Sequence, residues 1–306
     1  MRRTLAASAA GILLVAACTN DSEPDPASGD LAGATLVTTL AESDLELARH
    51  VLADGEGGLW IVLAEESGPG GALVHVLDGR VDGDRSLDTA PDGEPRFGYP
   101  TEFAAATPDG AVVLTDRPGG DVWVVGVEDG DYRRRITGAP RVGGLAVADD
   151  GTILVVDQAD EEVVGYTTGG TTVVVAGTDP EAVIRLSQPL DVPVSLAALP
   201  GDRIAVITDF AGIRSLRVLG PGGTGESMLT GEGDEMLGPV VATGDGRLLV
   251  IQPGQRVTLV DPDQRGERRT VLDGEGETLT SVAAVGDDLF VLHAGRLWRV
   301  EGALAG

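Results

Sequence analysis

The chain has 306 residues, of which 49 are acidic and 22 are arginine, and its formal net charge is -27 at pH 7. This charge argues against a nucleic-acid partner and would repel an anionic membrane surface. The sequence contains one cysteine, near its start, and no lysine. The rest of the chain therefore holds no disulfide, zinc-thiolate site or cysteine nucleophile, and Schiff-base chemistry is excluded.

The first 17 residues have the pattern of a secretory signal peptide. Arg2 and Arg3 form a positive segment, and the apolar run from Leu5 to Ala17 ends in small residues directly before Cys18. The sequence VAAC that ends at Cys18 resembles a bacterial lipobox. The resemblance implies a lipid on the Cys18 thiol, cleavage before Cys18, and a mature protein anchored on the outer face of a membrane. The alternative is an ordinary signal peptide in which Cys18 is incidental.

A tether is expected to follow the lipidated cysteine. Thr19 to Asp30, with the sequence TNDSEPDPASGD, is polar and lacks hydrophobic periodicity, which predicts a disordered linker. Because the body is acidic, the lipid would be its only attachment to the membrane. The expected organisation is a signal peptide at 1–17, a lipidated tether at 18–33 and one folded domain at 34–306.

The remainder of the chain contains six copies of one unit. The clearest copy, Gly144 to Gly177, reads as four short strands separated by Asp/Gly turns. An apolar run, an Asp/Gly turn and a second apolar run recur at Ala53–Val62, Ala104–Asp116, Ala146–Asp157, Leu196–Asp209, Val240–Gln252 and Val282–His293. Their spacing of roughly 40 to 50 residues predicts an all-β fold, a six-bladed β-propeller of four-stranded blades.

The ends of the body predict how the propeller closes. The last copy stops at Gly306 without a fourth strand, whereas a spare strand, Ala34 to Glu42, precedes the first copy. We expect this N-terminal strand to complete the sixth blade and thereby to remove an open sheet edge.

The third unit, PRVGGLAVADDGTILVVDQADEEVVGY, resembles an NHL repeat, whose pattern is Pro, Gly-Leu-Ala-Val, Asp-Gly, an apolar strand and Asp. The segments TPDGAVVLTD and RIAVITD in the second and fourth units match part of this pattern. The resemblance implies an NHL-like six-bladed propeller. Such propellers serve as ligand-binding platforms, as sensor domains and, in the gluconolactonase and streptogramin lyase types, as enzymes.

Long connections mark one face of the predicted propeller. The turns between first and second strands are short, whereas residues 65–71, 84–100 and 178–193 form long connections on the opposite face. Insertions gathered on one face indicate the binding face of a repeat protein. Asp179, Pro180 and Glu181 are also a helix-start signal, so Asp179 to Ser187 is expected to form either a short helix over the channel mouth or an irregular connection.

Candidate ligand-binding residues lie where the second strands end on that face. The equivalent position is Ala64 in the first unit and polar in the others. With His50, Glu102 and Arg141, which precede or begin channel-lining strands, the polar members form the candidate set: His50, Glu102, Asp116, Arg141, Asp157, Asp209, Gln252 and His293. The alternative for the three aspartates is that each caps its following turn by accepting backbone N–H bonds.

Two functions fit these residues. The leading prediction is a monomeric, non-catalytic propeller outside the cytoplasm that binds a small molecule or an envelope protein on the long-connection face, without a cofactor. The alternative is a metal-dependent hydrolase or lyase that uses His50, His293, Glu102 and the aspartates around a divalent cation such as Ca²⁺. A purely structural role in an envelope complex is a third possibility.

The first strands argue against a gluconolactonase. Their central segments, AAAT, LAVA, LAAL, VVAT and VAAV, are small and apolar where such an enzyme is expected to carry Glu, Asn and Asp. Trp60, Trp123 and Trp298 are expected to pack between blades, and His75, in an outer strand, is expected at the surface.

Overall fold

The computed structural model describes residues 31, 33–40, 47–64, 71–86, 103–116, 121–126, 132–136, 142–167, 172–179, 181–186, 188–221, 225, 227–232, 236–264, 267–274, 276 and 279–306. At residues 39, 84–86, 116, 132–136, 173 and 232 only the backbone is described. The predicted signal peptide, Cys18, and the tether as far as residue 30 lie outside this range, as do Glu102 and Arg141.

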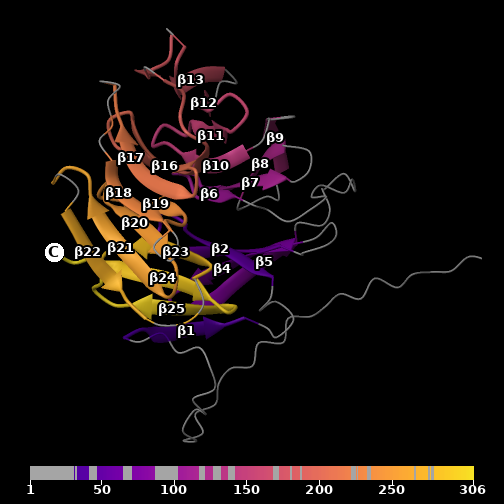
Figure 1. The fold of residues 1–306 in the computed structure, drawn as a ribbon. Coiled ribbons are helices and arrows are strands. Elements are labelled where there is room, and N and C mark those ends of the chain that lie inside the picture. Colours follow the sequence, from indigo (N-terminus) through magenta and orange to yellow (C-terminus); the bar gives the residue numbers. More distant parts are fainter. Residues whose placement is uncertain are drawn as a thin grey trace, which may run out of the picture.

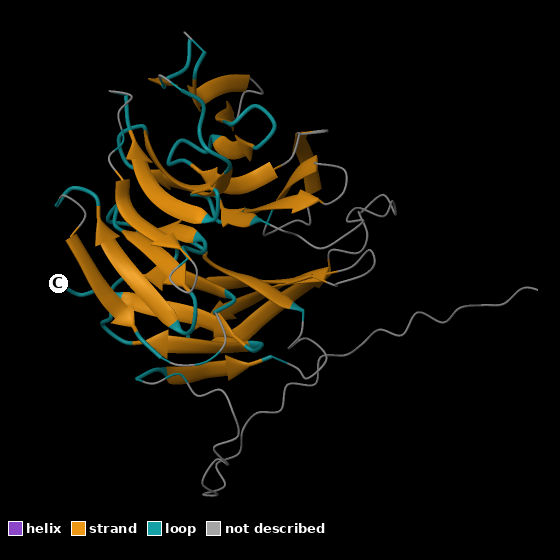
Figure 2. Cartoon of the chain, in the orientation of Figure 1, coloured by secondary structure: helices purple, strands orange, loops and turns teal. Residues whose placement is uncertain are grey.

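Every regular element in the described range is a β-strand, and the strands form six sheets (Figure 2). Blade 1 contains β2 (Ala48–Ala53), β3 (Leu59–Ala64), β4 (Gly71–Leu77) and β5 (Arg80–Ser86). Blade 2 contains β6 (Ala104–Ala106), β7 (Val112–Asp116), β8 (Asp121–Val125) and β9 (Tyr132–Ile136). Blade 3 contains β10 (Val142–Val147), β11 (Ile153–Asp157), β12 (Glu162–Tyr166), β13 (Thr172–Gly177) and β14 (Ile184–Arg185). The described residues form no helix that is long and apolar enough to cross a membrane.

Blades 4 to 6 follow the same order along the chain. Blade 4 contains β15 (Pro193–Leu199), β16 (Arg203–Phe210), β17 (Ile213–Leu219) and β18 (Ser227–Glu232). Blade 5 contains β19 (Val240–Ala242), β20 (Leu248–Gln252), β21 (Arg256–Asp261) and β22 (Glu267–Leu272). Blade 6 contains β23 (Ser281–Val285), β24 (Asp288–His293), β25 (Arg296–Val300) and β1 (Thr35–Thr39). The first strands of successive blades contact one another, and β23 contacts β2, which closes the ring (Figure 1). The predicted six-bladed β-propeller is confirmed.

The N-terminal strand closes the ring as predicted. β1 pairs antiparallel with β25, with Leu36 opposite Trp298, and lies beside it at the bottom of Figure 1. Leu31 and Leu40, on either side of β1, are 3% and 6% exposed and join the cores that blade 6 forms with its two neighbours. The first described residues are therefore part of the last blade.

The Asp/Gly turns have a backbone geometry that explains their sequence. Gly151 and Gly246, which follow Asp150 and Asp245, have φ angles of 80° and 85°. Residues with a Cβ rarely adopt a backbone conformation in this left-handed region, whereas glycine does so readily. The recurring Asp-Gly pair thus sets the tight turn from the first to the second strand.

The hydrophobic core lies between neighbouring blades, where alternate residues of facing strands meet. One cluster joins Leu249 of blade 5 to Val282 and Trp298 of blade 6, and another joins Trp60 and Val62 of blade 1 to Leu114 of blade 2. The predicted packing of tryptophans between blades is confirmed for Trp60 and Trp298, which are 7% and 4% exposed.

The helix-start signal at Asp179 produces a turn. The Asp179 carboxylate accepts the Glu181 N–H at 2.7 Å, and the Ala182 N–H bonds to the Asp179 carbonyl. The chain then forms β14, which runs parallel to β13 and buries Ile184 completely. The alternative of a short helix is wrong among the described residues here, because the backbone of β14 pairs with the outer edge of blade 3 and Ile184 joins the core between blades 3 and 4.

Blade 1 contains a cluster of hydrogen-bonded and packed residues around the buried Asp54, which we call the Asp54 clamp: Asp54, Gly58, Trp60, His75 and Asp82. Asp54 Oδ1 accepts the N–H groups of Glu56 and Gly58, both at 2.8 Å, and its Oδ2 lies 3.0 Å from His75 Nε2. His75 Nδ1 lies 3.5 Å from Asp82 Oδ2, and the imidazole packs on the Trp60 ring with centroids 4.4 Å apart. The side chain of His75 is 19% exposed, so it is partly buried at the position where the sequence predicted a surface residue.

The Asp54 clamp makes stability depend on pH. Burial acts to raise the pKa of Asp54, but the hydrogen bonds from His75 and from the Glu56 and Gly58 backbone outweigh it, so the pKa lies below its ordinary value of 3.8. A carboxyl whose pKa is lower in the folded state stabilises the fold above its unfolded pKa. That contribution disappears as the pH falls through the folded pKa.

Replacement of Asp54 by asparagine is expected to lower the free energy of unfolding by about 1–3 kcal/mol at pH 7, because charged acceptor bonds are lost. The difference from the native chain should shrink as the pH falls below about 3.8. Urea unfolding at several pH values measures this difference in the free energy of unfolding. Asp287→Asn, in the exposed turn of blade 6, is the matched control and should have little effect. A deficit for Asp54→Asn that stays constant down to pH 2.5 would contradict the account.

Candidate functional site

The first strands of the six blades enclose a cavity of about 310 Å³ in the central channel. Its walls come largely from small apolar runs, including Ala104 to Ala106, Leu196 to Ala198 and Val282 to Ala284. The sequence predicts that these runs line the channel, and the lining residues confirm it. Small side chains leave an open lumen at the axis, whereas larger ones would fill it. The volume is at the lower end of the range of about 300–1,000 Å³ for small-molecule sites.

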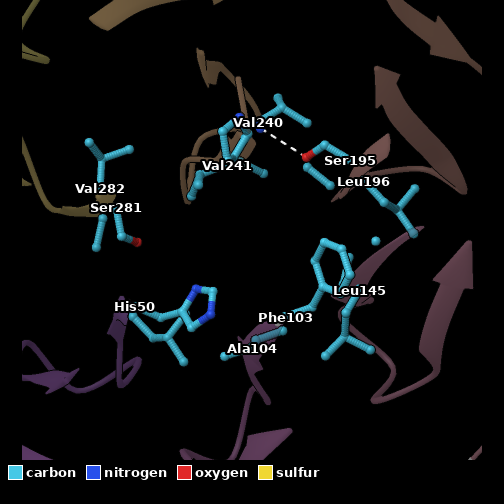
Figure 3. A pocket seen from close by; sticks show the side chains of 18 of the residues that line it. His50, Phe103, Ala104, Leu145, Ser195, Leu196, Val240, Val241, Ser281 and Val282 are labelled. Carbon is cyan, nitrogen blue, oxygen red and sulfur yellow. Dashed lines mark hydrogen bonds between the residues drawn. The ribbon is translucent and has the colours of Figure 1, made fainter. Parts of the chain in front are cut away.

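One end of the cavity is more polar than the other. His50, Phe103, Ser195 and Ser281 lie at or near the beginnings of their first strands, whereas residues such as Ala53 and Val147 lie at the ends, beside the Asp/Gly turns. The first strands begin on the long-connection face. In Figure 3 the rings of His50 and Phe103 extend into the cavity from neighbouring blades. The cavity is thus apolar along most of its walls, with polar and aromatic groups near the predicted binding face.

The two serines are held by the backbone of neighbouring blades. Ser195 Oγ accepts the N–H of Val240 at 3.0 Å, and Ser281 Oγ accepts the N–H of Val51 at 3.2 Å (Figure 3 shows the first bond). The first strand of each blade is a sheet edge, so its inward backbone groups need partners other than a strand. These bonds fix both hydroxyls at the cavity wall and join blade 4 to blade 5 and blade 6 to blade 1.

The described aspartate side chains of the candidate set are hydrogen-bonded to their own turns. Asp157 Oδ1 accepts the N–H groups of Ala159 and Asp160 at 2.8 and 3.3 Å. Asp209 Oδ1 accepts the Gly212 N–H at 3.0 Å, and its Oδ2 pairs with Arg214 at 3.2 Å. These are the hydrogen bonds expected if each aspartate caps its following turn. Asp116 ends β7, and its side chain lies outside the described structure.

Gln252 and His293, the next two candidates, also have partners of their own. Gln252 accepts a 2.6 Å hydrogen bond from Thr258, and His293 is 6% exposed with its Nε2 3.5 Å from Gln255 Nε2. Of the candidates whose side chains the structure describes, His50 alone lines the cavity. Across the described residues, no three His, Cys, Asp or Glu side chains are grouped so that they could hold a metal ion. The structure therefore does not bring the described candidates to one centre.

Three cavity residues were missed by the sequence analysis although a signal for them exists. Phe103, Ser195 and Ser281 directly precede the apolar segments AAAT, LAAL and VAAV. Alignment of the six units one residue further towards the N-terminus would have placed them near the equivalent of His50. The signal is weak because each residue breaks the apolar pattern only once.

Comparison with known proteins supports the fold. No protein-family model and no curated protein matches the sequence. Among solved structures, the chain is similar to a PQQ-bound aldose sugar dehydrogenase from Streptomyces coelicolor, with a TM-score of 0.61 and 14% identity over 90% of this chain and 98% of that one. It is also similar to a streptogramin B lyase (0.54; 9%; 85% and 95%) and a putative gluconolactonase (0.52; 12%; 88% and 93%). At these identities the similarity shows the propeller fold alone.

Proposed function

We propose that the chain is a binding protein outside the cytoplasm, anchored by a lipid on Cys18, that holds a small molecule in its central cavity. The observation that carries this proposal is the cavity itself, with apolar walls and a few polar groups near the long-connection face. That combination is the usual chemistry of small-molecule sites. The lipobox-like sequence before Cys18 supports the location, and the rigid propeller supports a recognition role.

The hydrogen bonds of the candidate residues favour a binding role over a catalytic one. General acid–base chemistry requires side chains within hydrogen-bond reach of one reacting group. Asp157 and Asp209 are bonded to their own turns, and Gln252 is bonded to its own blade. The similar structures include a lyase and a putative gluconolactonase, so a metal-dependent hydrolase or lyase is the alternative that an experiment must separate.

A protein partner on the long-connection face is a second candidate. Phe210 and Val192 are 66% and 46% exposed, and the Asp209 N–H bonds to the Val192 carbonyl, which brings both apolar side chains to the same part of that face. Exposed apolar groups of this size can mark an interaction surface. Phe210→Ser separates the two candidates, because this change would weaken capture of an envelope partner and leave the cavity intact.

Filling the cavity is expected to abolish binding without loss of the fold. Ala105 lines the cavity, is partly exposed and packs against the core between blades 2 and 3, so the larger side chain of Ala105→Leu is expected to narrow the lumen. The probe is 2-dimethylaminonaphthalene, a neutral fluorophore whose emission changes on leaving water. We expect saturable binding to the native chain and at least tenfold weaker binding to Ala105→Leu, whereas Ala305→Leu, at an exposed position, should bind normally.

Two results would count against this function. Probe binding that is unchanged in Ala105→Leu would place the apolar site elsewhere. Lactone or ester turnover that depends on His50, and that is lost on treatment with a chelator, would instead favour the enzyme alternative.

A further inference from the structure

The serine hydroxyls at the cavity wall are arranged to donate hydrogen bonds. A hydroxyl has one proton and two lone pairs. The Val240 N–H uses one lone pair of Ser195 Oγ and the Val51 N–H uses one lone pair of Ser281 Oγ, so the proton of each hydroxyl can be given to a molecule in the cavity. A carbonyl or another acceptor group in that molecule could therefore take a hydrogen bond from either hydroxyl, and each oxygen also keeps a second lone pair.

The described part of the lining also favours a neutral molecule. None of the described residues around the cavity is Asp, Glu or Arg, and His50 is the one titratable group among them. Transfer of an isolated charge from water into such a site is costly without an opposite charge to receive it. The chain's net charge of -27 adds a repulsive field for anions.

Two rings favour a flat shape. Phe103 and His50 extend into the cavity from neighbouring blades, as Figure 3 shows. Aromatic rings bind the faces or edges of other rings better than aliphatic chains of the same area. The side chains of the small alanines and valines along the deeper walls offer contact area without directional polar groups.

From these observations we infer that the cavity takes a neutral, flat, mainly apolar molecule whose hydrogen-bond acceptor, such as a ketone or lactone carbonyl, bonds to Ser195 or to Ser281. This inference rests on the proposed function, because it names the ligand class of the same cavity. The apolar part of the ligand lies against the first-strand alanines, and its ring lies between His50 and Phe103.

The test uses three probes that share one naphthalene ring. They are 2-dimethylaminonaphthalene, its 6-propionyl derivative with a ketone acceptor, and the corresponding 6-carboxylate, which is anionic at neutral pH. Dissociation constants are measured by fluorescence for the native chain, Ser195→Ala, Ser281→Ala, Phe103→Ala and Ala105→Leu. The ketone is expected to bind about tenfold more tightly than the parent amine, and the carboxylate is expected to bind more weakly than the ketone.

The variants distinguish the parts of the inference. At least one serine variant should lose several-fold in affinity for the ketone, and both variants should keep their affinity for the parent amine, which also shows that they are folded. Phe103→Ala should weaken both neutral probes to a similar extent. Ser195→Thr retains a hydroxyl and should retain the preference for the ketone.

Failure of the ligand class is distinguishable from failure of the function. If both neutral probes bind equally, if the ketone preference persists without the serines, or if the carboxylate binds most tightly, the ligand class is wrong although the cavity binds. If no probe binds in a manner that Ala105→Leu prevents, the cavity is not a binding site, and the proposed function and this inference both fall.

Discussion

Removal of the N-terminal strand β1 is expected to lower the free energy of unfolding by about 4–10 kcal/mol, because two buried leucines are lost together with the strand. Leu31 and Leu40 are 3% and 6% exposed and belong to separate inter-blade cores. A loss of this size is comparable with the whole stability of a typical domain, about 5–15 kcal/mol. The truncated chain should also associate, since β25 becomes an open sheet edge.

The comparison needs two truncated chains, one beginning at Asp30 and one beginning at Ser43. Both lack the predicted signal peptide and lipid, and they differ in the presence of β1. Thermal and urea unfolding by circular dichroism give stability, and size-exclusion chromatography gives association. Leu36→Ala, within β1, is the matched control for Leu40→Ala, directly after β1, because Leu36 is 45% exposed and its loss should have little effect on stability. Equal stability of the two truncated chains would contradict closure of blade 6 by β1.

The second large effect is expected for Gly58→Ala in the Asp54 clamp. A Cβ at Gly58 would lie 2.3 Å from Asp54 Oδ2 and 2.9 Å from His75 Nε2. These distances are too short for van der Waals contact, so the methyl group must displace the carboxylate or the imidazole. Displacement breaks the bond between them and disturbs the packing of His75 on Trp60. We expect the free energy of unfolding to fall by about 2–4 kcal/mol.

Gly83→Ala is the matched control for this substitution. Gly83 lies opposite His75 in the pairing of β4 with β5, and a Cβ there would meet nothing within 4 Å. Urea unfolding should show little change for Gly83→Ala, and the His75 ring resonances should move in Gly58→Ala alone. A clamp that tolerates Gly58→Ala as well as it tolerates Gly83→Ala would show that the bond between Asp54 and His75 contributes little to stability.

The architecture was predictable because its signals are local and repeated. The Asp-Gly pair at Gly151 recurs at Gly246, and each marks a turn whose positive φ favours glycine. The spare strand near Thr35 could be assigned to the last blade because that blade lacked one strand. Repetition compensates for weak individual signals, since an error in one unit is corrected by the others.

The features that were missed depend on contacts between distant residues. Asp54, His75 and Asp82 belong to different strands or turns, and no periodicity predicts that they meet. At Asp179 a valid local helix-start signal was overridden, because burial of Ile184 against blade 3 stabilises an extended segment.

The candidate site was only partly predictable because strand register is irregular at its polar end. β-bulges interrupt the pairing between Ala48 and His50 and between Pro193 and Ser195. A bulge changes which side chains face the channel, and alternation of polar and apolar residues does not reveal it. His50 was therefore found by its position near a strand start, whereas Ser195 was hidden in an apolar segment.

The most direct test of a small-molecule site in the channel is methyl NMR of the chain labelled at its alanine methyl groups, during titration with the propionyl naphthalene. We expect saturable shifts at Ala105, Ala146 and Ala284, which line the cavity, and none at Ala182 or Ala305, which lie outside the lining. Shifts confined to Ala182 and other residues outside the lining, or cavity methyls that remain unchanged at saturating probe, would contradict the account.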